Sequence, residues 1–217
     1  MTQIFILVGQ STLQTLAMTF FSALFAVILG FPLGILLNIT NKFGITPKPV
    51  FNIILSRIID VLRSFPFVIL MIVLLPVTRL ILGSAIGTAP TIVPLAIAAM
   101  PFVARITESA LSEVDPGMVQ AAKAMGSTNW QIIYKVLIPE AMPSVASGIT
   151  LTIITLIGYS AMAGTLGGGG LGDLAIRYGY QRFRTGIMVA AVIVIIVLVT
   201  AIQYAGTKIT NHMMSKR

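Results

Sequence analysis

The most prominent pattern in this sequence is a series of long apolar runs without charged residues, separated by short polar segments. The uncharged runs cover residues 1–41, 64–78, 80–104, 141–172 and 185–207. A helix that crosses a bilayer needs about 20 predominantly apolar residues. The pattern therefore predicts five membrane-spanning helices, near residues 13–38, 53–77, 91–111, 143–165 and 186–205.

The second predicted span begins with an unusual set of charges. Arg57, Asp60 and Arg63 follow one another at three-residue intervals and so share one helix face. We expect these three side chains to pair with one another at the membrane surface. A role in transmitting motion is the alternative.

Composition supports a membrane protein, because 57% of the residues are hydrophobic and only 9% are charged. Soluble domains carry about 25% charged residues, which is what they need to cover their surface. The expected fold is all-α, with residues 1–217 forming a single domain whose core covers about 12–206. The first span should be retained, because no Lys or Arg precedes Lys42 as in a cleaved signal peptide.

The excess of positive charge predicts the orientation of the chain. There are 14 basic and 6 acidic residues, a formal charge of +8. Basic residues collect in cytoplasmic loops, and an outside N-terminus with an inside C-terminus gives the better division, 10 inside against 4 outside. This topology explains the charge without nucleic-acid binding. The inner set is Lys42, Lys48, Arg57, Arg63, Arg105, Lys123, Lys135, Lys208, Lys216 and Arg217, and the outer set is Arg79, Arg177, Arg182 and Arg184.

The polar segment between the third and fourth spans begins with signals for a short helix. Asp115 followed by Pro116 is typical of an N-cap and a first helical residue. A helix over 119–125 should follow, and Gly126 suits the left-handed position that ends it. Val119 and Met125 would offer apolar contact to a partner.

A second short helix is predicted directly after this turn. Thr128 and Gln131 have capping-box spacing, so the helix should begin near Asn129 and end at Pro139 and Pro143, before the fourth span. Two short helices joined by a glycine turn could sit in a groove of another protein. The alternative is a surface-lying element that only connects two spans. Further apolar contact would come from Trp130, Ile133 and Tyr134.

The same segment resembles the EAA loop of ABC importer permeases. The matching positions are Gln120, Ala121, Ala122, Gly126, Val136, Ile138 and Pro139, and the spacing fits throughout, although Gln120 replaces the usual glutamate. The resemblance implies that residues 115–139 form the coupling helix that docks in a cleft of a cytoplasmic ATPase. The residues implied in coupling are Gln120, Ala121, Ala122, Met125, Gly126, Trp130 and Pro139.

The energy source is expected on that partner. The sequence lacks a glycine-rich loop ending in Gly-Lys-Ser/Thr, which would cradle phosphates. Its only glycine-rich run, at 164–172, has no lysine and lies at the outer end of the fourth span. ATP and Mg²⁺ therefore belong to the partner ATPase, and this chain needs no cofactor.

Further segments are similar to the MetI-type permeases, which import methionine. They are Leu16-Ala17-Met18-Thr19, Arg63-Ser64-Phe65-Pro66-Phe67, Pro101-Phe102-Val103-Ala104-Arg105 and Gly158-Tyr159-Ser160-Ala161-Met162. The resemblance implies the type I ABC importer permease fold in a bacterial inner membrane. It also implies a pore formed by two copies of this chain, driven by two ATPase subunits and supplied by an extracytoplasmic methionine-binding lipoprotein.

The fourth span is the candidate translocation path. Tyr159, Ser160 and Met162 could form a narrow gate, since methionine is flexible enough to seal a gap and still move. Core filling is the alternative for Met162. The spacing of Gly164 and Gly168 suggests close helix packing, at a dimer axis for example.

Two alternatives to an ABC permease remain open, a passive channel and an intramembrane enzyme. An enzyme would need a catalytic set inside the spans, but these contain almost no acid, and the single histidine, His212, lies outside them. No catalytic or metal site is expected, and the chain has no cysteine. Arg105 and Glu108, three residues apart, are expected to form a structural ion pair. Within the ABC class, the substrate could be another amino acid or small metabolite.

Overall fold

A computed structural model describes residues 2–215, and almost all of them are helical. Lys216 and Arg217, which entered the orientation count, lie outside the described residues. The elements are α1 (Thr2–Thr40), α2 (Pro49–Ser64), α3 (Phe67–Leu82), α4 (Thr88–Ser112), α5 (Pro116–Ala124), α6 (Asn129–Ile132), η1 (Ile133–Leu137), α7 (Ile138–Ala163), η2 (Gly164–Gly168), α8 (Gly170–Asp173), η3 (Leu174–Tyr180) and α9 (Thr185–Met214), where η marks a π-helical turn.

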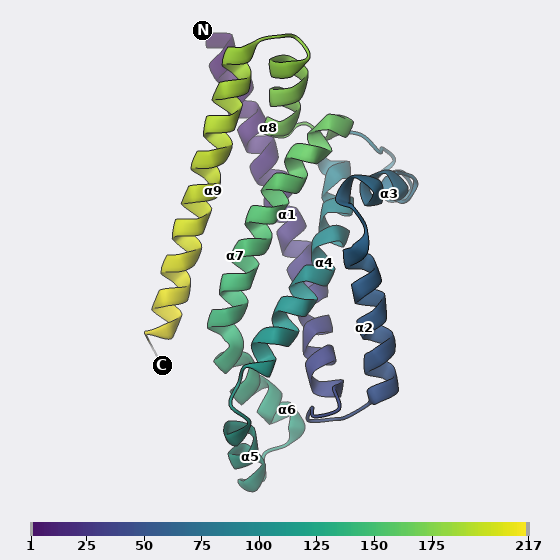
Figure 1. Ribbon diagram of the computed structural model, residues 1–217, viewed down its shortest axis with the longest axis vertical. Coiled ribbons are helices and arrows are strands. Elements are labelled where there is room, and N and C mark those ends of the chain that lie inside the picture. The colour runs from purple at the N-terminus through teal and green to yellow at the C-terminus, as the bar shows by residue number, and fades with distance from the viewer. Residues whose placement is uncertain (1, 216–217) are drawn as a thin grey trace.

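Three long helices, α1, α4 and α7, pack together at the centre of the molecule (Figure 1). Met18 of α1, Val103 of α4 and Leu156 of α7 lie in their shared core and are almost completely buried. α9 packs on one side of this group and α2 on the other (Figure 1). Many other apolar side chains, such as Ile196 of α9, remain exposed, as expected for helices that face lipid.

Four stretches are long and apolar enough to cross a membrane, namely Phe5–Thr40, Thr88–Ser112, Asn129–Gly168 and Thr185–Met214. They correspond to the first, third, fourth and fifth predicted spans. The second predicted span, over 53–77, is a bent pair of helices that together are long and apolar enough to cross, which gives five spans if the pair is counted as one. α2 and α3 occupy this region and meet at an angle of 105°.

The break between α2 and α3 has a local cause. Phe65 precedes Pro66, and the proline ring excludes the helical conformation from the residue before it. Phe65 accordingly has an extended backbone, with φ −72° and ψ 128°. α3 therefore runs across the end of the bundle instead of continuing α2 (Figure 1).

The second short helix of the polar segment also differs from the prediction. It does not end at Pro139 or Pro143, because α6, η1 and α7 form one helical run. In η1 the amide of Ile138 bonds to the carbonyl of Ile133, five residues back. Such a wide turn accommodates a proline, which lacks its own amide donor and crowds the preceding turn. The fourth span therefore begins inside the predicted loop.

The glycine-rich run forms a tight reversal at the end opposite α5 and α6 (Figure 1). Gly167 and Gly169 have positive φ values of 88° and 77°, which side chains rarely adopt. Within the chain, a Cβ atom on Gly164 would clash with the backbone amide nitrogen of Asp173. The small residues thus serve packing inside one subunit.

Candidate coupling loop and translocation path

The loop between α4 and α7 begins with the predicted capping interactions. Asp115 accepts a hydrogen bond from the amide of Gly117 at 2.7 Å, and Pro116 occupies the first turn of α5. Gly126 follows α5 with φ 79°, the left-handed conformation expected at a helix end. These contacts confirm the start of the first helix and its glycine end.

The second half of the loop is fixed by a complete capping box. The Thr128 hydroxyl accepts from the amide of Gln131 at 3.3 Å, and the Gln131 side chain accepts from the amide of Thr128 at 2.8 Å. Two amide donors are thereby satisfied where α6 begins. The two short helices and the turn between them form one ordered projection at the end of the molecule (Figure 1).

The projection presents some of its apolar residues to the outside and keeps others in the core. Met125, Trp130 and Tyr134 are 80%, 73% and 66% exposed. Ala122 and Ile133, in contrast, are buried against α4 and α7. Ile133 was expected to offer contact to a partner, and that prediction is wrong because the residue anchors the loop to the bundle. Of the other motif residues, Gln120, Ala121, Gly126 and Pro139 are exposed.

A cavity of about 420 Å³ lies beside the first short helix. Gln120 and Lys123 line it from α5, and Asn38 and Asn41 line it from the end of α1. The Asn38 amide donates to the Ser112 hydroxyl at 3.0 Å, which joins α1 to the end of α4. The face that carries the motif is thus hollow on the side of Gln120.

The charged residues of α2 and α4 form a different network from the predicted one. Arg105 of α4 lies 2.7 Å from Glu108 Oε2 and 2.7 Å from Asp60 Oδ1. It also donates to the Ser56 carbonyl at 3.1 Å. The expected contact of Arg105 with Glu108 is therefore present. The predicted mutual pairing of Arg57, Asp60 and Arg63 is wrong, because Asp60 points to Arg105 across the helix interface.

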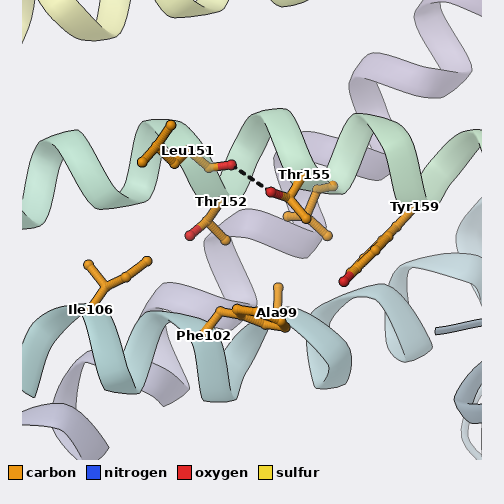
Figure 2. A pocket seen from close by; sticks show the side chains of 8 residues that line it. Ala99, Phe102, Ile106, Leu151, Thr152, Thr155 and Tyr159 are labelled. Carbon is orange, nitrogen blue, oxygen red and sulfur yellow. Dashed lines mark hydrogen bonds between the residues drawn. The ribbon is translucent and has the colours of Figure 1, made fainter. Parts of the chain in front are cut away.

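A second cavity, of about 130 Å³, lies between α4 and α7, with α1 behind it (Figure 2). The candidate path residues are placed differently around it. Tyr159 lines the cavity, whereas Ser160 is buried and donates to the Ile157 carbonyl at 2.8 Å. Met162 lies one turn further on, 47% exposed. The lining is formed by Ala99, Phe102, Ile106, Leu151, Thr152, Thr155, Leu156 and Tyr159.

The two aromatic walls of this cavity are held by the broken helix pair. The guanidinium of Arg63, in α2, lies 5.1 Å from the centre of the Phe102 ring. The ring of Phe67, in α3, stacks on Tyr159 with 4.5 Å between centroids and 3° between planes. The two contacts lie on either side of the break at Phe65, so the geometry of the break positions both walls.

Sequence reasoning missed the partnership of Arg105 with α2 and the role of the break. The first has no local signal, because Asp60 and Arg105 are 45 residues apart. The second did have one, since the Phe65–Pro66 step is a predictable helix end.

An apolar helical bundle with two short helices projecting from one end fits a membrane transport permease. The chain belongs to the family described as "Binding-protein-dependent transport system inner membrane component", whose profile matches residues 30–212. It is 50% identical over 206 residues to the probable D-methionine transport system permease protein MetI of Pasteurella multocida, covering 95% of each chain. It is 44% identical over 176 residues to the methionine import system permease protein MetP of Bacillus subtilis, covering 81% of this chain and 79% of that one.

Solved structures agree with this membership. The fold matches a chain of the MetNI methionine ABC transporter in inward-facing conformations, with a TM-score of 0.96 and 40% identity over 98% of this chain and 99% of that one. An amino acid ABC transporter structure, 21% identical, has the same fold with a TM-score of 0.75, covering 100% of this chain and 97% of that one. The chain therefore has the permease fold and is a transport subunit, not an enzyme.

Proposed function

We propose that this chain is the membrane-spanning permease subunit of an ATP-driven importer of methionine in the bacterial inner membrane. The observation that carries the proposal is the ordered projection of α5 and α6, which presents Met125 and Trp130 outside the bundle. A large exposed apolar surface on a capped, rigid element is typical of a protein interface. Methionine follows from the MetI and MetP relatives, with another amino acid as the alternative substrate.

The working assembly would contain two copies of this chain and two ATPase subunits, which bind ATP and Mg²⁺. An extracytoplasmic methionine-binding lipoprotein would deliver the substrate, and lipid would cover the exposed apolar helices. The projection then lies in the cytoplasm, and the N-terminus, at the opposite end of the bundle (Figure 1), lies outside. The C-terminus lies inside.

Docking of the ATPase would rest on shape more than on charge. Gln120 replaces the acidic residue of the motif, and its exposed amide can accept hydrogen bonds but cannot form an ion pair. Ala121 keeps the outer face of α5 thin, and Gly126 allows the sharp turn after it. The exposed rings of Trp130 and Tyr134 would supply most of the apolar contact.

The translocation path would run past α7. Tyr159, Ser160 and Met162 remain the proposed path residues, and Tyr159 reaches the cavity between α4 and α7. Met162, which is half exposed, could move to open or seal the path. The Arg105 network would hold α2 and α4 in register while the path changes shape.

Two matched tyrosines test the assignment of the projection. Tyr134 and Tyr180 are 66% and 70% exposed, but Tyr180 ends η3, which packs on α8 at the opposite end of the bundle (Figure 1). Tyr134→Ala should lower the amount of ATPase that co-purifies with the permease about tenfold, because exposed aromatic residues dominate such interfaces. Tyr180→Ala should leave co-purification unchanged. Equal co-purification of the ATPase with both variants would contradict the proposal that the projection binds the ATPase.

A further inference from the structure

The cavity between α4 and α7 has the properties of a weak binding site for an unbranched apolar side chain. It lies between the middle of α4, at residues 99–106, and the second half of α7, at residues 151–159, near the depth where transporters bind their substrates. Among the described residues, the eight that line it carry no charge. A site without charge can release its ligand, which transport requires at every cycle.

The hydroxyl groups in the lining do not make the cavity a polar site. Thr155 donates to the carbonyl of Leu151 at 2.9 Å (Figure 2), and Thr152 donates to that of Gly148 at 2.9 Å. Both donors are therefore used inside the helix, which leaves methyl groups and oxygen lone pairs facing the cavity. A ligand that needs hydrogen-bond donors or a counter-ion would be poorly held here.

The size of the cavity fits a short chain of atoms. Its volume is about 130 Å³. An apolar protein cavity of about 150 Å³ lined by Leu, Ile and Phe binds benzene, which has six heavy atoms. The side chain of methionine has four. The cavity can therefore enclose that side chain and not a whole lipid acyl chain.

The two aromatic walls add selectivity for sulfur. Phe102 and Tyr159 face the cavity from α4 and α7, and each ring is fixed from outside by Arg63 or Phe67. A thioether sulfur makes favourable contacts with ring edges at about 5 Å. Because neighbouring side chains hold both rings in place, the rings need not reorient when the sulfur binds.

We infer that this cavity binds the side chain of the transported amino acid, leaving the charged amino-acid head outside it in the aqueous path. The inference rests on the proposed function and adds the contact residues to it. Contacts with Phe102, Thr155 and Tyr159 then select the bound side chain by its length and polarity.

Photo-crosslinking tests the site directly in the assembled permease and ATPase complex. The probe is a methionine analogue whose unbranched side chain carries a diazirine in place of the thioether. We expect labelled peptides from residues 99–106 and 151–159, with labelling suppressed by excess methionine but not by excess glycine, which has no side chain. Labelling elsewhere, or labelling that methionine does not suppress, as from a lipid-filled groove, would overturn the inference.

Uptake by the full transporter with its binding protein provides an independent test. Thr155→Phe should fill the cavity and slow methionine uptake about tenfold, the effect of small misfits in an apolar pocket. A matched control outside the cavity should retain wild-type uptake. Thr200→Phe in α9 is the matched control, since Thr200 is also exposed and bonds to the carbonyl four residues earlier at 2.8 Å.

Different results would overturn the side-chain site and the proposed function. Wild-type uptake of methionine with an unaffected Thr155→Phe variant would overturn the side-chain site and leave the proposed function standing. Absence of methionine uptake in the wild-type complex would overturn the proposed function itself. ATPase activity without substrate should stay within twofold of wild type in the Thr200→Phe control.

Discussion

At the scale of single residues, the backbone at Gly126 is the most constrained feature of the projection. Its φ of 79° is costly for any residue with a Cβ atom, by about 1–2 kcal/mol. The space around it is open in this chain, so the strain comes from the backbone alone. In the proposed assembly, a larger residue here would also enter the cleft of the ATPase.

We therefore expect Gly126→Leu to reduce ATP-driven uptake at least tenfold, because the backbone strain and the clash with the partner act together. Gly83→Leu is the matched control. Gly83 also has open space and a positive φ, of 73°, but it follows the last residue of α3, away from the projection. The measurement is uptake into proteoliposomes at equal protein content. Equal losses in the two variants would mean that strain explains the effect without coupling.

Arg105 is the second residue whose environment makes a quantitative prediction. Its side chain is 22% exposed, and its loss would leave Asp60 and Glu108 without their counter-charge. We expect Arg105→Met to destabilise the protein by about 1–3 kcal/mol, less than the loss of a fully buried pair, because Asp60 is 48% exposed and solvent screens its charge. Thermal unfolding in detergent measures the change.

The control for Arg105 is an ion pair on the surface. Arg177 is 57% exposed and lies 3.5 Å from Asp173. Arg177→Met should change stability by about 0–1 kcal/mol, because exposed pairs contribute little. Similar losses in both variants would contradict the special role of the Arg105 network.

At the scale of elements, the capping box at Thr128 fixes the second half of the projection. Thr128→Val removes one hydrogen bond and should cost about 1 kcal/mol. The amides at the start of α6 should then exchange with deuterium about fivefold faster, as such a free energy implies. Ser127→Ala is the control, because its hydroxyl has no hydrogen bond among the described residues. Unchanged exchange in Thr128→Val would show that packing, not the cap, holds α6.

The helix ends were predictable where a local rule acts alone and failed where packing competes. Asp115, Gly126 and Thr128 behave as their residue types require. Pro139 was taken as a helix end, yet η1 absorbs it because α6 is anchored in the core through Ile132. At Phe65 the error was the reverse, since a local rule was present and the apolar pattern was followed instead.

At the scale of the whole molecule, long apolar helices were predictable and their partnerships were not. Length and charge are enough to identify four spans. The candidate gate of Tyr159, Ser160 and Met162 was one sequence cluster, but a helix turns about 100° per residue, so Ser160 points away from Tyr159 into the core and Met162 lies one turn further along. Only Tyr159 reaches the cavity. Contacts such as that of Arg63 with Phe102 depend on how α2 packs against α4, and the lengths of the apolar runs do not predict this packing.

The orientation predicts which surface each loop faces. The chain has no cysteine, so single cysteines can be placed without background. Lys42→Cys, between α1 and α2, should react with an impermeant maleimide only after the cells are opened, because the proposed orientation places its loop in the cytoplasm. Ser84→Cys, between α3 and α4, should react in intact cells. The opposite pattern would reverse the topology and place the projection outside, where no ATPase could reach it.

The most direct test of the central claim is methionine uptake into proteoliposomes that contain this chain, its ATPase partner and the binding protein. We expect methionine to accumulate inside the proteoliposomes above its outside concentration, and accumulation to stop when ATP or the ATPase is omitted. This chain alone should hydrolyse no ATP. Equilibration of methionine without ATP would contradict the account and identify a passive channel.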